Sequence, residues 1–293
     1  MTKLLGFNRI VAAVALVAGL SLPVAAGEPR RIVAIGGSVT ETLAALGLAD
    51  ALVGVDTTST FPAAVVATLP KVGYMRQLSA EGVIALRPSA VLAIVGTGPA
   101  DALKLIADAG VPVTPVPERF SPSGAADKIR TIGAAVGRTA EAAKLADAVT
   151  RRFEALAAGN RLIDKPVRAM FALSAQNGRL TASGRGTAAD EVLRLAGTVN
   201  AVDGFDGYKP LSDEAVIAAA PEAIVVMEQG GQPAGEILAF PSLAPTPAAI
   251  AGRMIAMDGN YLLGFGPRAP AAIAALRARL YPGIVFPPLE PGQ

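Results

Sequence analysis

A tyrosine and an arginine stand two residues apart in the stretch VGYMRQLSAEG, residues 72–82. The chain has four tyrosines and no tryptophan, cysteine or histidine. Without histidine there can be no Ser-His-Asp triad, imidazole general base or histidine metal site. Without cysteine we expect no disulfide framework, thiol nucleophile or diacylglycerol anchor. Tyr74 and Arg76 are therefore candidates for binding a ligand rather than for hydrolytic chemistry.

A second tyrosine lies in a weak repeat of the same stretch. Residues 207–227 read GYKPLSDEAVIAAAPEAIVVM, and aligning Leu211 with Leu78 gives eight identities over 17 positions. With one residue deleted in the loop, Tyr208 falls on Tyr74. The repeat predicts two related lobes that face each other. We expect both tyrosines to contact a ligand across the cleft, because neither belongs to an apolar periodic segment and such folds bind ligands at facing strand ends.

The repeat also pairs two glutamates, Glu81 and Glu214, each two residues after a serine that can cap the next helix. The helix dipole alone favours a carboxylate in a first turn, by about 0.3–1 kcal/mol at an exposed site. Their symmetric placement suggests in addition a pair of acidic contacts for a two-fold symmetric partner.

Alternating strands and helices position these residues. RIVAIGGSVTETLAALG, residues 31–47, predicts a strand, a glycine loop and a helix with Ser38 as N-cap, Glu41 three residues on and Gly47 at its end. Further strand and helix patterns follow up to residue 116 and resume at VRAMFALS, residues 167–174. Such alternation is typical of parallel, helix-covered sheets.

A continuous helical pattern between Thr139 and Ala158 predicts a rod of roughly 30 Å. We interpret it as a stiff connector between two halves, with an ordinary surface helix as the alternative. The expected fold class is α/β: two Rossmann-like lobes with central parallel sheets, joined by one long rigid helix, with the ligand cleft between them. The expected boundaries are 27–136 for the first lobe, 137–160 for the connecting helix and 161–293 for the second lobe.

Residues 1–26 have the pattern of a secretory signal peptide. Lys3 and Arg9 precede the apolar run 10–20, and small residues at 23–27 indicate cleavage after Ala26. The remaining chain then has equal numbers of basic and acidic residues, so no basic field favours nucleic acid. We expect an exported protein that does not bind nucleic acid.

With these motifs the chain resembles the periplasmic substrate-binding proteins of ABC importers, in the helix-linked class that binds cobalamin, siderophores and haem. The haem-binding branch fits best, and the resemblance covers essentially the whole mature chain. The motifs that carry it are RIVAIGGSVTETLAALG (31–47), VGYMRQLSAEGVIALRP (72–88), SGRGTAAD (183–190), GYKPLS (207–212) and LLGFGPR (262–268). The resemblance implies a periplasmic, monomeric protein that is not an enzyme and that carries haem b as transported ligand. It also implies delivery to an inner-membrane ABC permease dimer with its ATPase.

For the iron, the resemblance implies that Tyr74 is the axial ligand. Only the phenolate is a good hard ligand for ferric iron, so the metal and a nearby cation must favour ionisation. Arg76 is the expected cation, through a hydrogen bond to the phenolate oxygen, and Met75 is expected to pack against the ring. Family members with a histidine in the second lobe use it as a second ligand or for a second haem. This chain has none, so we expect a five-coordinate haem, with a second haem on Tyr208 as the alternative.

For the haem propionates, Arg268 in GFGPR is the first candidate, because a guanidinium and a helix N-terminus could receive a carboxylate together. Arg185 and Lys209 are further candidates. In the related cobalamin system one acidic residue on each lobe docks onto arginines of the permease, and the matching residues here are Glu81 and Glu214.

Two other functions remain open. A siderophore or cobalamin binder of the same class would favour tryptophans or an arginine cluster, and tryptophan is absent. An exported α/β enzyme could use the Gly36-Gly37 loop as a phosphate cradle, but the loop lacks both the GxGxxG and the GxxxxGK[ST] spacing.

Overall fold

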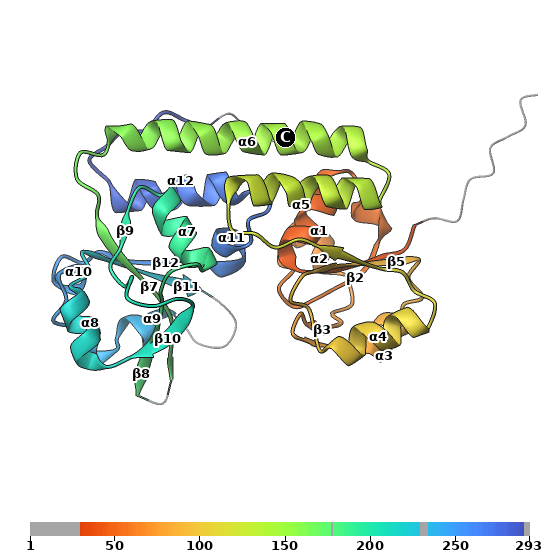
Figure 1. The fold of residues 1–293 in the computed structure, drawn as a ribbon, viewed down its shortest axis with the longest axis horizontal. Coiled ribbons are helices and arrows are strands. Elements are labelled where there is room, and N and C mark those ends of the chain that lie inside the picture. Colours follow the sequence, from red (N-terminus) through yellow and green to blue (C-terminus); the bar gives the residue numbers. More distant parts are fainter. Residues whose placement is uncertain (1–29, 177, 229–233, 290–293) are drawn as a thin grey trace, which may run out of the picture.

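The computed structural model describes residues 30–176, 178–228 and 234–289. The expected signal peptide, residues 1–26, lies outside them. Among the residues described, no helix is long and apolar enough to cross a bilayer. The helices and strands form two α/β lobes that lie below one long helix in the view of Figure 1.

The first lobe is built on a four-stranded parallel sheet. Its strands lie in the order β2 (Leu52–Val55), β1 (Ile32–Ile35), β5 (Ala90–Ile94) and β6 (Val113–Val116). Its helices are α1 (Gly37–Ala45), α2 (Ala63–Val66), α3 (Ala80–Ala85), α4 (Ala100–Asp108) and α5 (Pro122–Ala135). Every residue of β1 is buried, as expected for a strand covered on both faces. The strand order reverses beside β1, which places a ligand crevice at the carboxyl ends of β1 and β5.

The glycine loop after β1 differs from the prediction in one detail. Helix α1 begins at Gly37 with Gly36 as N-cap, so Ser38 is not the capping residue and lies buried in the first turn. Gly36 has a φ of 106°, and a Cβ at Gly37 would lie 2.7 Å from the carbonyl oxygen of Thr58. The two glycine N–H groups donate instead to Asp56 Oδ1 (2.9 Å) and Thr58 Oγ1 (3.1 Å). The cap therefore comes from the segment after β2, which no local pattern indicates.

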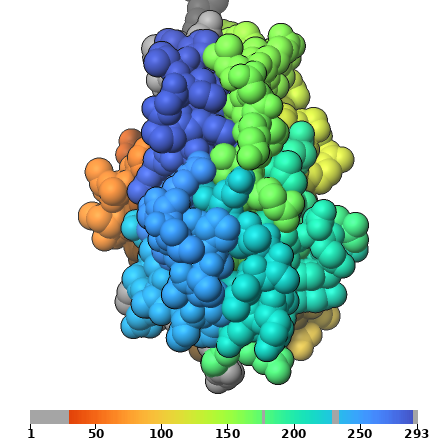
Figure 2. Space-filling view, turned by 90° about the vertical axis from the view of Figure 1, so that its left-hand side faces the viewer, coloured from red at the N-terminus to blue at the C-terminus, as the bar shows by residue number. Residues whose placement is uncertain are grey.

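Helix α6 (Thr139–Gly159) is the predicted rod, with 21 residues. Its buried positions include Val149, Phe153 and Leu156, which recur at helical spacing. It runs above both lobes (Figure 1), and its neighbours are α5 and α12 (Ala269–Leu280). Seen from the end of the second lobe, α12 in blue and α6 in green lie side by side at the top (Figure 2).

The second lobe contains a six-stranded sheet that is only partly parallel. Its main order is β10 (Tyr208–Leu211), β8 (Arg179–Ser183), β7 (Arg168–Gln176), β11 (Ala223–Glu228) and β12 (Met254–Asp258), with β9 (Val199–Asn200) also on β7. Strands β7, β9, β11 and β12 are parallel, whereas β8 is antiparallel to both β7 and β10. Its helices are α7 (Ala188–Leu195), α8 (Asp213–Ala219), α9 (Ala234–Leu238), α10 (Pro247–Ile250), α11 (Gly259–Leu263) and α12. The parallel centre was predicted, and the antiparallel edge was not.

The internal repeat is present in the structure. Ser79 and Ser212 cap α3 and α8 by accepting hydrogen bonds from Gly82 N (3.0 Å) and Ala215 N (3.2 Å). Each helix is followed by a non-glycine residue of positive φ, Arg87 (45°) or Ala220 (43°). A proline and the central strand β5 or β11 come next in each copy. The two lobes therefore share one structural unit.

One hydrophobic core joins the lobes. The largest cluster of buried apolar side chains combines residues of β1, α1 and α5 with residues of α6, β7, α7 and α12. Two smaller clusters lie on the opposite faces of the two sheets, one in each lobe. The shared core crosses from one lobe to the other beneath α6. It therefore holds the two lobes together on that side of the molecule.

Candidate functional site

A cavity of about 540 Å³ lies between the lobes. The first lobe lines it with segments that follow β1, β2, β5 and β6, and with the turn between β3 (Gly73–Tyr74) and β4 (Gln77–Leu78). The second lobe contributes the start of α7, the start of β10, the end of β11 and helix α11 with Gly264. The volume is in the range of small-molecule and cofactor sites. The cleft predicted at the facing strand ends is confirmed.

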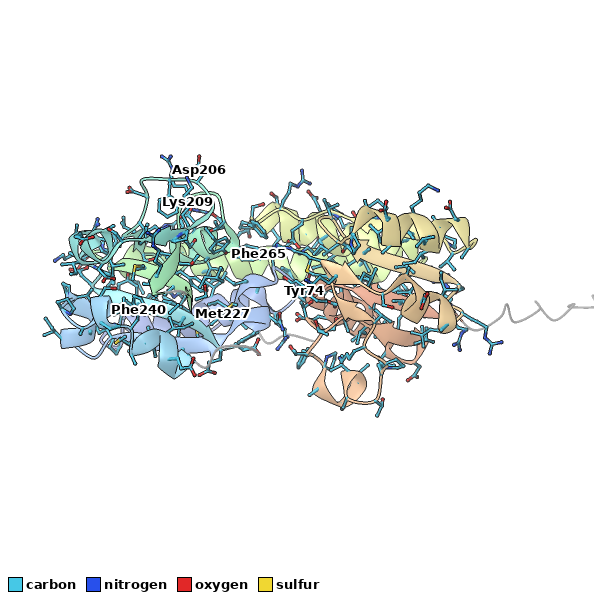
Figure 3. The ribbon with its side chains drawn as sticks, turned by 90° about the horizontal axis from the view of Figure 1, so that it is seen from below. Tyr74, Asp206, Lys209, Met227, Phe240 and Phe265 are labelled. Atoms are coloured by element: carbon cyan, nitrogen blue, oxygen red, sulfur yellow. The ribbon has the colours of Figure 1, made fainter. Side chains whose placement is uncertain are left out.

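Tyr74 is presented to this cavity by a tight hairpin. Gly73 has a φ of 104°, and a Cβ there would lie 2.7 Å from the carbonyl oxygen of Gln77, so the turn requires glycine. Backbone hydrogen bonds from Gly98 N to Met75 O and from Leu78 N to Gly98 O, both 2.9 Å, fix the hairpin to the loop after β5. The Tyr74 side chain is 40% exposed and points toward the second lobe (Figure 3). The phenol is therefore held on a rigid support and left accessible.

Met75 and Arg76 follow Tyr74 along the cavity wall. Met75 is half-buried and packs against apolar clusters of its own lobe and of the shared core. Arg76 is exposed on the same wall. Burial raises the pKa of Tyr208 on the other lobe, and the positive charge of Arg76 opposes this larger effect.

Tyr208 lines the opposite wall from the edge strand β10, where it pairs with Ser183 of β8. Burial raises the pKa of its phenol, although the residue as a whole is 37% exposed. Smaller opposing effects come from the Thr187 hydroxyl, the Ala189 N–H in the first turn of α7 and the charge of Arg76. Burial dominates, so the neutral phenol is favoured at Tyr208.

Arg268 is already engaged by the protein. Its backbone N–H donates to Glu41 Oε1 (2.7 Å), and its Nε donates to Oε2 (2.9 Å). The guanidinium also lies over the rings of Phe61 and Tyr261, 3.5 Å and 4.8 Å from their centroids. Burial raises the pKa of Glu41 against the effect of Arg268. Arg268 is not among the residues lining the cavity; its pair with Glu41 joins the second lobe to the first.

Arg185 and Lys209, the other propionate candidates, also lie outside the cavity lining. Arg185 forms an exposed ion pair with Asp206, with 3.1 Å between Nε and Oδ1. The Lys209 ammonium lies 5.2 Å from the centroid of the Phe205 ring. Figure 3 shows Lys209 and Asp206 at the outer edge of the second lobe, well away from Tyr74.

Glu118 is a charged residue of the cavity that the sequence did not single out. Its Oε1 accepts a hydrogen bond of 2.8 Å from Lys128, whose side chain is completely buried. Burial raises the pKa of Glu118 and lowers that of Lys128, and each partner opposes the shift of the other. In the part of the chain that the structure describes, no group of three or more acidic residues is placed to hold a metal ion.

Glu81 and Glu214 are exposed in the first turns of α3 and α8. Hydrogen bonds from its own backbone N–H and from Ser212 lower the pKa of Glu214. Helices α3 and α8 lie at the bottom of the two lobes, opposite α6 (Figure 1). Each lobe therefore carries one exposed glutamate at the start of a helix of the repeat.

Comparison with known proteins identifies the family. The model described as "Periplasmic binding protein" matches residues 32–261. The chain belongs to the periplasmic binding protein family. Members of this family are substrate-binding transport proteins and not enzymes. The alternative of an exported enzyme with a phosphate-binding glycine loop is therefore not supported.

Solved structures and curated relatives of this periplasmic binding protein agree with the fold. The periplasmic heme-binding protein RhuT from Roseiflexus sp. RS-1, in apo form, is 36% identical with a TM-score of 0.82, covering 86% of this chain and 98% of that one. The periplasmic heme-binding protein BhuT, in complex with two hemes, is 38% identical with a TM-score of 0.77, over 86% and 97%. The ABC transporter substrate-binding lipoprotein YvrC of Bacillus subtilis (strain 168) is 30% identical over 87% of this chain and 81% of its own.

Sequence reasoning found the tyrosines of this binding protein but missed its buried charges. Glu118 follows strand β6, and the rule that ligands lie at carboxyl strand ends could have indicated it. Lys128 lies on the same face of α5 as the buried residues Ala125, Ile129 and Ile132, so helical spacing could have indicated its burial but not its partners. The Glu41–Arg268 pair joins residues 227 positions apart in the sequence, so no local spacing predicts it.

Proposed function

We propose that this periplasmic binding protein binds haem in the cavity between its lobes and delivers it to an inner-membrane ABC importer. The observation that carries the proposal is the exposed phenol of Tyr74 on a cavity whose walls are mostly glycines and apolar side chains. A flat apolar ring with an iron centre requires such walls and one hard ligand. The similarity to proteins described as heme-binding supports the same ligand.

In this proposal Tyr74 is the axial ligand of ferric haem. Haem iron accepts tyrosinate as a protein ligand, and the chain has no histidine or cysteine to compete for this position. Met75 packs beside the ring, and the charge of Arg76 favours a phenolate at the cavity wall. Among the residues that the structure describes, Arg76 is the one cationic residue that lines the cavity with solvent access, so it also receives a haem propionate.

Tyr208 forms the opposite wall. Because burial favours its neutral phenol, we assign it to ring contact or hydrogen bonding rather than to the iron. The result is a five-coordinate haem. The related BhuT holds two hemes, so a second haem on the Tyr208 side is the alternative stoichiometry.

Delivery is assigned to the surface that carries Glu81 and Glu214. These exposed carboxylates stand at equivalent helix starts of the repeat, one on each lobe. A permease dimer offers two copies of one basic surface, which fits two acidic sites related by the repeat. We further propose that the mature protein is a periplasmic monomer released by cleavage after Ala26.

The direct test is ligand selection by the purified apo-protein. Haemin, cyanocobalamin and a ferric hydroxamate siderophore are titrated separately and binding is followed by absorption spectra. We expect saturable binding of haemin with a ferric tyrosinate spectrum and no saturable binding of the other two. Binding of cobalamin or siderophore in preference to haemin would replace the proposal with the alternative in the same class.

A further inference from the structure

Lys128 joins three separate segments at one point. Its side chain is completely buried, and Nζ donates to Glu118 Oε1 (2.8 Å), Ser38 Oγ (3.1 Å) and the carbonyl oxygen of Gly264 (3.0 Å). An ammonium group has three N–H donors, so all of them are used. A buried charge with a complete set of partners fixes its surroundings, because loss of any partner leaves an unpaired buried group.

All three acceptors line the interlobe cavity. Ser38 lies in the first turn of α1 and Glu118 follows β6, both in the first lobe, whereas Gly264 follows α11 in the second lobe. Lys128 therefore lies directly behind the cavity wall at the seam between the lobes. It is the cation that ties wall segments of both lobes to a common point.

The segment that follows Gly264 packs tightly against the first lobe. Phe265 is fully buried with a positive φ of 46°, and its ring centroid lies 5.7 Å from that of Phe120 on the cavity wall. Figure 3 shows Phe265 between the two lobes. A Cβ at Gly266 would lie 3.2 Å from Ser38 Cβ, so the backbone of the second lobe is in close contact with α1. The segment 264–268 is thus a joint whose position determines the cavity wall.

We propose that Lys128 is a positioning residue of the ligand site: it ties Gly264 of the second lobe to Glu118 and Ser38 of the first, and thereby sets the shape and charge of the cavity wall. The effect on haem rests on the proposed function. Lys128 does not touch the ligand, because its ammonium is enclosed by its three acceptors. It also neutralises Glu118, whose unpaired carboxylate would repel the propionates of haem.

The test uses a pair of substitutions that avoids a buried unpaired charge. Lys128→Met alone would leave Glu118 without its cation and could prevent folding, so the informative variant is Lys128→Met combined with Glu118→Gln. Arg277→Met is the matched control, because Arg277 is also a fully buried cation. It donates to Leu156 O (2.8 Å) and Asn160 Oδ1 (3.1 Å), away from the cavity.

Two readouts are measured on the full-length mature protein. The first is the haemin Kd by spectroscopic titration, with the free energy of unfolding measured in parallel. We expect the double variant to bind haemin about tenfold or more weakly, and Arg277→Met to keep the wild-type Kd even where it is less stable. Equal Kd values for the double variant and wild type, or equal weakening in Arg277→Met, would overturn the proposal.

The second readout needs no haem. Hydrogen–deuterium exchange of the apo-protein should be faster at residues 264–268 in the double variant than in wild type, and unchanged there in Arg277→Met. If wild type fails to bind haemin, the proposed function fails while this measurement still decides the positioning role. Unchanged exchange at residues 264–268 in the double variant would contradict that role.

Discussion

Tyr74 and Tyr208 begin equivalent copies of the internal repeat, yet the backbone presents them differently. Tyr74 stands on a two-residue hairpin strand fixed to the loop after β5, whereas Tyr208 stands on the edge strand of a mixed sheet beside the start of α7. After the tyrosines the copies converge, with a serine-capped helix, a residue of positive φ, a proline and a central parallel strand. The repeat thus conserves the scaffold and the acidic helix start, while the tyrosine segments diverge.

This difference separates two tasks. The helix starts with Glu81 and Glu214 are similar in the two copies of the repeat, and they are suited to a symmetric partner. The two tyrosine segments differ between the copies, and they are suited to a ligand whose two faces need different contacts. Burial favours the neutral phenol of Tyr208, and only the first copy has an arginine two residues after its tyrosine.

The largest effect is expected from reversing both acidic charges. Glu81→Arg combined with Glu214→Arg should reduce haem uptake by cells to background, because both contacts with a basic permease would become repulsive. The haemin Kd should stay at the wild-type value, since neither residue lines the cavity. Each single reversal should give intermediate uptake if the two lobes dock equivalently.

The matched control for charge reversal is Glu141→Arg. Glu141 is also a first-turn glutamate, but it belongs to α6 on the opposite side of the molecule (Figure 1). Uptake should be normal in this variant. Loss of uptake in Glu141→Arg, or full uptake in the double reversal, would remove the docking surface from the account.

Arg76→Ala should weaken haemin binding by about tenfold, the low end of the effect of removing a group that supports a metal ligand. It should also raise the pKa of Tyr208 further, because the charge of Arg76 lowers that pKa in the wild type. Haemin titration measures the first effect, and alkaline titration of the phenolate absorbance measures the second. Arg185→Ala is the control: its guanidinium forms an exposed ion pair with Asp206 outside the cavity, so neither quantity should change.

The smallest effects are expected at the two caps. Ser79→Ala and Ser212→Ala should each lower the free energy of unfolding by about 1 kcal/mol, because each removes one hydrogen bond to a helix N-terminus. Denaturant unfolding measures both losses. Asparagine at either position should restore the stability, since it caps nearly as well as serine. A loss at only one site would show that the two copies of the repeat differ in stability as well as at their tyrosines.

Local patterns predicted most of the architecture but few contacts between the lobes. Alternating apolar runs, Ser79 as cap and Gly47 at the end of α1 follow from short-range rules, and the structure confirms them. The antiparallel strand β8 was missed, although an Asn-Gly pair at residues 177–178 of the sequence is a known hairpin signal.

The buried charges could not have been predicted in the same way. Lys128 meets Ser38 and Gly264 across 90 and 136 positions, and Arg268 meets Glu41 across 227. Such contacts depend on how two finished lobes are placed, which no sequence window contains. For the same reason Arg268 looked available for a ligand in the sequence, although the folded chain gives it a carboxylate of its own.

The most direct test of the central claim compares Tyr74→Phe with Tyr208→Phe in haemin titrations followed by absorption spectra. The account predicts that Tyr74→Phe loses the tyrosinate-to-iron absorption and binds haemin about 100-fold or more weakly, since even supporting groups of a metal ligand are worth about 10–100-fold. Tyr208→Phe should keep that absorption and change the Kd only a few-fold. Retention of the tyrosinate spectrum in Tyr74→Phe together with its loss in Tyr208→Phe would contradict the assignment of the iron to Tyr74.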